Sequence, residues 1–257
     1  MRTVPEHPEM NLRNAVGSAG WRLYECGDVE STNDIARGLP PWTAVRAAVQ
    51  SGGRGRFGRA FVSDRGGLWI SAVLPATEGP QVWAGFSLMA GCHLVRMLEA
   101  LCVRDARLRW PNDLMAGSKK LGGLLIEQSG PGFLIVGFGL NVTNRPWEGE
   151  PGLAGIATSL ECEAEGVPGL EDVTVRTLDA LAEAHHAMLG GGMDAAIREF
   201  NDRWRRPIPV RILLSGGGST CGRFAGLDPR GNLRLLDESG NQTVVGHHRV
   251  ERLMETA

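Results

Sequence analysis

The segment GGRGRFGR, residues 52–59, decides between two classes of fold that mix helices and strands. Its glycines satisfy the GxGxxG pattern of dinucleotide-binding folds, and it follows a predicted strand over residues 45–49. In those folds the loop opens directly into a helix whose N-terminus binds the pyrophosphate. Here residues 59–67 show no helical period and lead into a second apolar strand, residues 68–74. The segment is therefore not a dinucleotide-binding loop, and it does not match the Walker pattern GxxxxGK[ST].

The rest of the chain mixes strands and helices without strict βαβ alternation. Apolar residues at helical spacing predict helices over residues 82–101, 172–189 and 195–204. Shorter apolar runs predict strands over 107–110, 122–127 and 133–142, the last two joined by a turn at 129–132. A short helix is expected after the N-cap sequence at 31–34, whereas residues 1–20 are polar and irregular. The pattern favours an α+β fold with a mixed sheet flanked by helices.

The C-terminal part of the chain has a different pattern. Four short apolar runs are separated by turns rich in glycine, asparagine, aspartate and proline, at residues 210–214, 221–227, 233–236 and 243–245. This pattern predicts a small all-β barrel of about 50 residues, joined to the helical block at Pro207–Pro209. We therefore expect two domains, residues 1–206 and residues 207–257.

Composition excludes several classes of function. The 257 residues carry 27 Lys and Arg against 29 Asp and Glu, a net charge of −2, so no global field attracts nucleic acid or anionic membranes. Five cysteines without a CxxC pair favour a reducing cytoplasm, and neither they nor the six histidines show metal-ligand spacing. The N-terminus lacks a signal-peptide pattern, and too few residues precede Ser31 for a DNA-binding domain. We expect a cytoplasmic protein that binds neither DNA nor membranes.

The glycine-rich loop concentrates positive charge on an otherwise neutral chain. Arg54, Arg56 and Arg59 stand among glycines, in a protein whose 36 glycines are about twice the usual ~7% share. Glycine lets the backbone approach a ligand closely, and guanidinium groups bind phosphate or carboxylate oxygens through paired hydrogen bonds. The loop is suited to closing over two anions brought together for reaction, but a solvated basic loop would show the same sequence.

Five segments, in the same order along the chain, resemble biotin–protein ligases. They are STN at 31–33, QSGGRGRFGR at 50–59, RWPND at 109–113, KKLGGLLIE at 119–127 and GFGLNV at 137–142, with a weaker match, ATSL, at 157–160. The C-terminal β segment is similar to the small SH3-like domain of that family, so the resemblance covers most of the chain. It implies a class II synthetase-like catalytic domain and the monofunctional type, without an N-terminal DNA-binding domain.

The resemblance implies an ATP-dependent biotin–[acetyl-CoA-carboxylase] ligase. In that family the carboxylate of biotin attacks the α-phosphate of ATP, which enters with Mg²⁺, and the products are biotinyl-5′-AMP and pyrophosphate. Biotin then passes to a lysine of a biotin carboxyl carrier protein domain, in acetyl-CoA carboxylase or a related carboxylase. Members occur as monomers and as homodimers joined through a sheet edge, and no tightly bound metal is implied.

Two other functions fit parts of the pattern. A lipoate or octanoate ligase or transferase resembles this family in fold, and a noncatalytic biotin or adenylate sensor would keep the fold without turnover. The Gly/Arg loop followed by Trp-Pro-Asn-Asp and Lys-Lys-Leu-Gly-Gly is the biotin-type arrangement. The presence of Arg54, Arg56 and Lys120 argues against a sensor.

The resemblance assigns the reacting end of the site to basic residues. Lys120 would contact the reacting carboxyl and α-phosphate oxygens and Arg54 would lie near both, so these two are the expected catalytic residues. Gly53 and Arg56 belong to the loop that folds over biotinyl-adenylate. Fixed cations aimed at developing phosphoryl charge stabilise such a transfer. The alternative for Lys120 is a solvated lysine beside Lys119.

The resemblance assigns the biotin pocket to short polar residues and glycines. Hydrogen bonds to the ureido ring would come from Ser31, Thr32, Asn33 and Gln50. Helix capping is the alternative for the first three, and a surface position for Gln50. Backbone and an apolar wall would come from Gly122, Gly123 and Leu125, which could instead form a tight turn and part of the core.

Four further residues belong to the predicted site. Asn112 and Asp113 follow a Trp-Pro pair at a strand end, where Asp113 would position Lys120 or assist Mg²⁺, or where the two could simply form a turn. Asn141 matches a position that contacts the adenylate, near the adenine or ribose, and its alternative is a cap at a strand end. Phe61 stands where the family often has a tryptophan that stacks on adenine, and it offers a smaller aromatic face.

Overall fold

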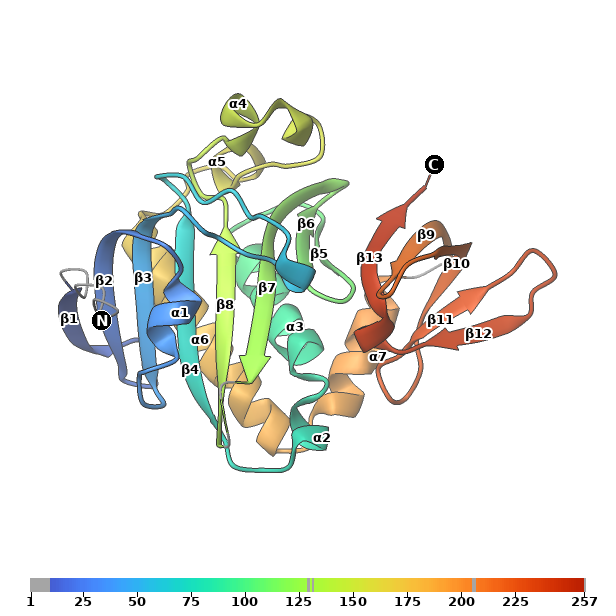
Figure 1. Ribbon diagram of the computed structural model, residues 1–257, viewed down its shortest axis with the longest axis horizontal. Helices are drawn as coiled ribbons and strands as arrows, with labels where there is room; N and C mark the ends of the chain where they lie inside the picture. Colours follow the sequence, from blue (N-terminus) through green and yellow to red (C-terminus); the bar gives the residue numbers. More distant parts are fainter. Residues whose placement is uncertain (1–9, 129, 131, 205–206, 257) are drawn as a thin grey trace, which may run out of the picture.

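The structure is a computed structural model that describes residues 10–128, 130, 132–204 and 207–256. Its strands form two sheets, one of eight strands and one of five (Figure 1). Three sequence predictions fall partly outside the described residues: the irregular N-terminus, the turn at 129–132 and the domain boundary between residues 206 and 207.

The larger sheet is mixed, as the sequence predicts. In the described chain its strand order is β1-β2-β3-β4-β8-β7-β6-β5, with β2 and β3 parallel and the other neighbours antiparallel. The strands are β1 (Met10–Val16), β2 (Trp21–Val29), β3 (Thr43–Gln50), β4 (Leu68–Ala76), β5 (Ala106–Arg109), β6 (Asp113–Ala116), β7 (Lys119–Gln128) and β8 (Gly132–Leu140). With helices beside this sheet, the α+β fold class is confirmed.

Helices cover the two faces of the larger sheet unequally. The long helices α3 (Phe86–Ala100) and α6 (Leu170–Leu189) lie behind the sheet in Figure 1, and α7 (Met193–Arg203) packs on α3. The short helix α1 (Thr32–Ala36) lies in front, against β3 and β4. Because helices cover both faces of β4, eight of its nine residues are buried. No helix among the described residues is long and apolar enough to cross a membrane.

The helix predicted over residues 82–101 is two helices. A short helix, α2 (Pro80–Trp83), ends before α3 begins at Phe86. The break coincides with Gly85, where an added Cβ would lie 2.3 Å from the terminal methyl of Met193. The apolar side chains of the predicted helical stripe are buried within α3, whereas Val82 of α2, the first residue of that stripe, is 39% exposed. The prediction of one continuous helix was wrong, since Gly85 lies outside both helices as the N-cap of α3, with φ −94° and ψ 3°.

The sequence prediction missed the two N-terminal strands, β1 and β2. Residues 10–16 form β1, which pairs antiparallel with β2, so the prediction of an irregular segment is wrong for these residues. Five successive residues of β1, from Asn11 to Ala15, are exposed because the strand lies at the edge of the sheet. An edge strand exposed on both faces shows no alternation of apolar and polar residues, which is the signal that predicts a strand.

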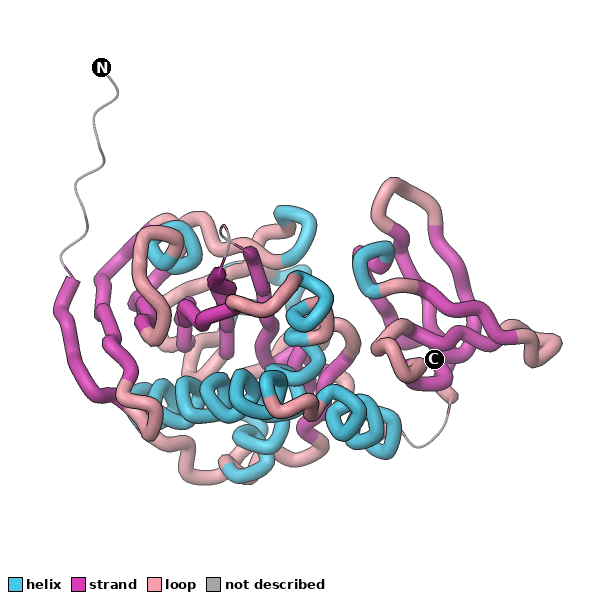
Figure 2. The backbone as a smooth tube through the Cα atoms, turned by 90° about the horizontal axis from the view of Figure 1, so that it is seen from below, coloured by secondary structure: helices cyan, strands magenta, loops and turns pink. Residues whose placement is uncertain are grey.

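The second sheet is antiparallel and follows α7 in the chain. Its order is β12-β11-β10-β9-β13, formed by β9 (Ile208–Leu214), β10 (Ser219–Leu227), β11 (Leu233–Leu236), β12 (Gln242–Val245) and β13 (Val250–Glu255). The four predicted C-terminal strands are confirmed, and β13 was missed. Figure 2 shows this sheet standing beside the larger one, with the long helices along one side of the larger sheet. In Figure 1, β13 is the strand of the second sheet that faces the larger sheet.

The remaining elements are short. They are the helices α4 (Pro146–Gly149) and α5 (Leu160–Glu163) and the 3₁₀ turns η1 (Arg56–Gly58), η2 (Pro151–Leu153) and η3 (His247–Arg249). The first turn lies inside the Gly/Arg loop, and η2 with α4 forms the segment that follows β8. Both segments contribute to the site described next.

Candidate active site

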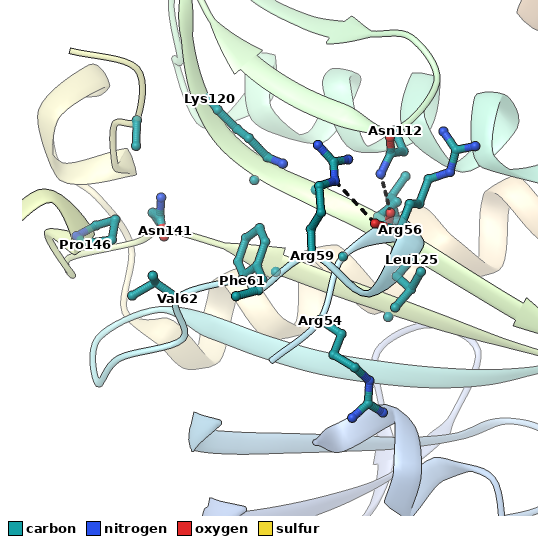
Figure 3. Close-up of a pocket in the computed structure, with 18 of the residues that line it drawn as sticks. Arg54, Arg56, Arg59, Phe61, Val62, Asn112, Lys120, Leu125, Asn141 and Pro146 are labelled. Atoms are coloured by element: carbon teal, nitrogen blue, oxygen red, sulfur yellow. Dashed lines mark hydrogen bonds between the residues drawn. The ribbon is translucent and has the colours of Figure 1, made fainter. Parts of the chain in front are cut away.

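A cavity of about 620 Å³ opens at the larger sheet and is lined in part by β13. Figure 3 shows residues that line it, among them Lys120, Phe61 and the arginines of the Gly/Arg loop. Most of the residues predicted for the site line it: Ser31, Thr32, Asn33, Gln50, Arg54, Arg56, Phe61, Asn112, Lys120, Gly122, Gly123, Leu125 and Asn141. Gly53 and Asp113 are absent from the lining. The structure therefore brings together in one cavity residues that lie up to 110 positions apart in the sequence, from Ser31 to Asn141.

The first end of the cavity is polar and buried. Ser31, Thr32 and Asn33 are 3–5% exposed. The backbone N–H of Thr32 donates to Oε1 of Gln50 at 2.9 Å, which ties the start of α1 to the end of β3. Ser31 occupies the N-cap position of α1, yet its hydroxyl makes no capping hydrogen bond. The capping alternative therefore does not hold for Ser31, whose hydroxyl is left to the cavity.

The opposite end of the cavity is cationic. Nζ of Lys120 lies 2.6 Å from one carboxylate oxygen of Asp113, and Nη2 of Arg109 lies 2.7 Å from the other. Burial alone would raise the pKa of the Asp113 carboxyl, but the charges of Lys120 and Arg109 outweigh burial and hold this pKa below its usual value. In this structure the carboxylate of Asp113 therefore holds the ammonium of Lys120 by an ion pair.

The backbone of β7 fixes where Lys120 stands. Its N–H donates to the carbonyl of Ile156 at 2.8 Å, and its own carbonyl accepts from the N–H of Thr158 at 2.9 Å. Further along β7, an added Cβ at Gly122 would lie 2.5 Å from the carbonyl oxygen of Gly139. Gly122 therefore permits close pairing of β7 with β8 beneath the cavity.

The three loop arginines are bound to protein groups. Arg54 donates to both carboxylate oxygens of Asp34 at 2.6 Å, and this bond raises its pKa. In Figure 3 its side chain points toward α1 and away from Lys120. The expected place of Arg54 beside the reacting groups is therefore not the place it takes in this structure.

Arg56 and Arg59 join the loop to the second sheet. Nη2 of Arg56 donates to the carbonyl of His247 at 3.1 Å, and Nη2 of Arg59 lies 3.4 Å from the carbonyl of Glu251. Burial lowers the pKa of Arg56, and the charge of Arg59 lowers it further. Two cations of the predicted anion-binding loop thus lie next to each other at the wall of the cavity.

Phe61 lies beside the cationic end. Its ring meets Trp69 edge-on at 5.9 Å between centroids, and Nζ of Lys120 lies 5.4 Å from the Phe61 centroid. An added Cβ at Gly139 would lie 2.7 Å from the ring, so glycine is required under it. The phenyl face is therefore fixed where a planar group next to the reacting anions could stack.

Two asparagines of the predicted site hold neighbouring segments. Nδ2 of Asn112 donates to the carbonyl of Leu124 at 2.8 Å. Nδ2 of Asn141 donates to the carbonyl of Thr158 at 2.9 Å, and Oδ1 of Asn141 accepts from Asn144. Both asparagines line the cavity, but these hydrogen bonds of their amide groups stabilise the strand ends and loops around it.

Sequence reasoning missed two groups of lining residues. The segment after β8 contributes Pro146, Glu150, Leu153 and Ile156, and β13 contributes Arg252, Met254 and Glu255. Glu255 also pairs with Arg107 of β5 at 2.8 Å. These residues have no local pattern that marks them as a site. Among the described residues, no group of three His, Cys, Asp or Glu side chains is placed to hold a metal ion.

Comparison with known proteins agrees with this geometry. Residues 30–141 match the family described as "Biotin/lipoate A/B protein ligase family". The chain is 30% identical to the biotin–[acetyl-CoA-carboxylase] ligase of Mycobacterium tuberculosis, over 95% of each chain. It is 33% identical to that of Paracoccus denitrificans, over 84% of this chain and 94% of the relative.

A solved structure agrees with the sequence relatives. The biotin protein ligase from Aquifex aeolicus in complex with biotin and ATP superposes with a TM-score of 0.77 at 26% identity, over 91% of this chain and 99% of the other. Fold and site define a ligase of the class that activates a carboxylic acid and attaches it to a protein. Within that class, the chain belongs to the biotin protein ligase family.

Proposed function

We propose that this chain joins biotin to a lysine of a biotin carboxyl carrier domain in two steps, through biotinyl-5′-AMP. One observation carries the proposal: a single cavity joins a buried end rich in hydrogen-bonding groups to a cationic end. Biotin has the matching form, with a cyclic urea at one end and a carboxylate at the other. The cavity, at about 620 Å³, lies within the range usual for small-molecule sites.

In the first step a carboxylate oxygen of biotin attacks the α-phosphorus of ATP. The bond between this phosphorus and the bridging oxygen to the β-phosphate breaks, and pyrophosphate leaves with that electron pair. Lys120 would stand between the two anions, because Asp113 and the backbone of β7 fix it in the cationic end. A preorganised cation neutralises charge that develops on the α-phosphate without reorganising during the reaction. ATP enters as its Mg²⁺ complex, so the metal is part of the substrate.

Arg54 and Arg56 would contact the substrates after the Gly/Arg loop moves. Arg54 would exchange the carboxylate of Asp34 for the reacting carboxylate or phosphate, since both offer the same bidentate geometry to a guanidinium. Arg56 already lies at the cavity wall and needs only to release the carbonyl of His247. Gly53, an added Cβ of which would lie 2.5 Å from the carbonyl oxygen of Phe61, keeps the base of the loop narrow.

The nucleotide would occupy the part of the cavity beyond Lys120. Phe61 offers an aromatic face there, and Val62, Leu153 and Ile156 offer apolar contacts. Asn141 lies at the same end with its amide tied to Thr158. A phenyl face is smaller than an indole, so we expect weaker stacking on adenine than a tryptophan would give.

In the second step the ε-amine of the acceptor lysine attacks the mixed anhydride. AMP leaves, and biotin is bound through an amide. We propose that residues 1–206 form the catalytic unit and residues 207–257 a C-terminal unit. The C-terminal unit would take part in this step because its strand β13 forms part of the cavity wall. We further propose a homodimer through a sheet edge, for which β1 is an exposed edge strand, and a cytoplasmic location, with which five unpaired cysteines agree.

Lipoate and octanoate are the competing acids, since the matched family includes lipoate ligases. The polar end of the cavity favours biotin, because neither an alkyl chain nor a dithiolane ring can satisfy buried hydrogen-bonding groups. The test is to incubate the chain with Mg²⁺-ATP and each acid and to measure pyrophosphate release. We expect release with biotin and little with the other two acids. Release with lipoate or octanoate but not with biotin would overturn the assignment.

A further inference from the structure

A chain of hydrogen bonds runs from the surface to the polar end of the cavity. It starts at Arg37, whose guanidinium pairs with the carboxylate of Glu127 at 3.0 Å. Glu127 accepts a hydrogen bond from Nδ2 of Asn33 at 2.7 Å. Asn33 lines the cavity, whereas Glu127 does not. Glu127 therefore acts on the cavity only through the residues that it contacts.

Two groups fix the direction of the hydrogen bonds. A carboxylate can only accept, so Asn33 must turn its NH₂ group toward Glu127 and its carbonyl oxygen inward. A backbone N–H can only donate, so Gln50 must turn Oε1 toward the N–H of Thr32, 2.9 Å away. The other end of the Gln50 amide donates to Oγ of Ser63 at 3.1 Å.

The hydroxyl of Ser71 links these two ends. It lies 2.5 Å from Oδ1 of Asn33 and 2.7 Å from Oγ1 of Thr32, and it carries a single proton. Because Oδ1 of Asn33 has no proton to give, Ser71 donates to it. The contact between Ser71 and Thr32 is then a hydrogen bond only if Thr32 donates. The single proton of Thr32 is engaged either by Ser71 or by Oε1 of Gln50, 3.0 Å away, so Thr32 has no proton left for a ligand.

This arrangement leaves acceptors at the cavity surface. The oxygens Oγ1 of Thr32 and Oε1 of Gln50 lie 3.0 Å apart, and both residues line the cavity. The hydroxyl proton of Thr32 is already engaged, and Oε1 carries none. Two neighbouring oxygens that cannot donate to a ligand match a ligand that presents N–H donors at this position.

We propose that Glu127 is a positioning residue that sets the hydrogen-bond polarity of this end of the cavity and so selects a ring bearing N–H groups, such as a cyclic urea. This inference rests on the proposed function, because it assumes that the urea of biotin occupies the Thr32–Gln50 end. Gly137 makes the arrangement possible: an added Cβ there would lie 2.4 Å from Oδ1 of Asn33. Ring selection thus depends on a carboxylate that does not touch the ligand.

The test measures binding of two ligands that differ only in these donors. The first is biotin, and the second is its cyclic carbonate analogue, in which oxygen replaces both ureido N–H groups. We expect the wild-type chain to bind biotin about 100-fold more tightly than the analogue. The ring oxygens of the analogue would face the oxygens of Thr32 and Gln50 with no proton between them, so no hydrogen bond forms. In Glu127→Ala, Asn33 is free to turn over and the direction of the hydrogen bonds is lost. We expect the preference to fall about tenfold, with the KM for ATP unchanged within twofold.

Three variants complete the test. Glu127→Gln keeps an oxygen that can accept from both Asn33 and Arg37, so it should keep the wild-type preference within about twofold. Ser71→Ala breaks the same chain at another residue and should reproduce the loss if Glu127→Ala does not fold. Asp172→Asn removes an exposed carboxylate paired with Arg176 on α6 and should change nothing.

The outcomes separate this inference from the proposed function. A wild-type chain that binds neither ligand, with or without ATP, overturns the proposed function and this inference with it. A wild-type chain that prefers biotin, together with an unchanged preference in folded Glu127→Ala or Ser71→Ala, overturns this inference alone. A reduced preference in those variants, with Glu127→Gln and Asp172→Asn unchanged, supports it.

Discussion

At the scale of the residue, three contacts hold Lys120 in the cationic end of the cavity. Two are backbone hydrogen bonds to Ile156 and Thr158, and the third is the ion pair with Asp113. Lys119, its neighbour in the sequence, is exposed and alternates to the other side of β7. Sequence places two lysines side by side, and the strand directs only one of them into the site.

This difference predicts the effect of removing each lysine. Lys120→Ala should lower the rate of biotin-dependent pyrophosphate release by about 10²- to 10³-fold, because it removes a fixed cation from the developing phosphoryl charge. Lys119→Ala, the matched control, should keep the rate within twofold. Unchanged release by a folded Lys120→Ala variant would show that another group stabilises the α-phosphate.

The lowered pKa of Asp113 predicts how stability changes with pH. Its carboxylate stabilises the folded state above its unfolded pKa, about 3.9, and this contribution is lost as the pH falls through the lower folded pKa. The difference in free energy of unfolding between wild type and Asp113→Asn should therefore be largest above about pH 5 and shrink below pH 4. Urea unfolding between pH 7 and pH 3 measures it. A difference that stays constant over this range would contradict the shift.

At the scale of the element, the strand β8 carries glycines where other parts of the site come close. Gly137 faces Asn33, and Gly139 lies under the ring of Phe61. Each glycine makes room for one side chain of the predicted site, and β8 itself sits between β4 and β7 in the sheet. The glycine excess in the sequence is thus partly explained by close approaches to this strand.

Gly137→Ala tests that explanation. The new methyl group would displace Asn33 and with it the start of α1, so we expect the Kd for biotin to rise about tenfold while the fold is kept. Gly149→Ala is the control, since an added Cβ there meets nothing within 4 Å. Isothermal titration calorimetry measures the Kd for biotin of both variants. Equal affinities for the two variants would mean that Asn33 does not support the pocket.

Strands with a clear apolar run between turn signals were predictable from the sequence, whereas β1, β2, β6 and β13 were not. The strands β4 and β8 give apolar runs because neighbours cover most of their residues. By contrast, β1 is exposed along five residues and β6 has only four residues. The motif residues of the site were predictable because they are local, whereas the lining residues of β13 enter through tertiary packing alone.

At the scale of the whole molecule, the second sheet completes the cavity. Carbonyls of His247 and Glu251 accept hydrogen bonds from the loop arginines, and Glu255 pairs with Arg107 of the larger sheet. The loop that must move over the substrates is therefore bound, in this structure, to the sheet across the cavity.

Weakening this connection should change substrate binding more than folding. Glu255→Ala removes the ion pair with Arg107, and we expect the KM for ATP to rise about three- to tenfold while the melting temperature changes by only a few degrees. Glu238→Ala, in the exposed β11–β12 turn, is the control and should leave both values unchanged. A KM for ATP that is identical in the two variants would contradict a role for β13 in the site.

The central claim is that this cavity activates biotin and passes it to a carrier lysine. The most direct measurement is the intact mass of a biotin carboxyl carrier domain after incubation with the chain, Mg²⁺-ATP and equal concentrations of biotin and lipoate. We predict a single addition of the mass of one biotinyl group, which is lost when the acceptor lysine is replaced by arginine. Addition of a lipoyl group instead, or no addition when both substrates and carrier are present, would contradict the account.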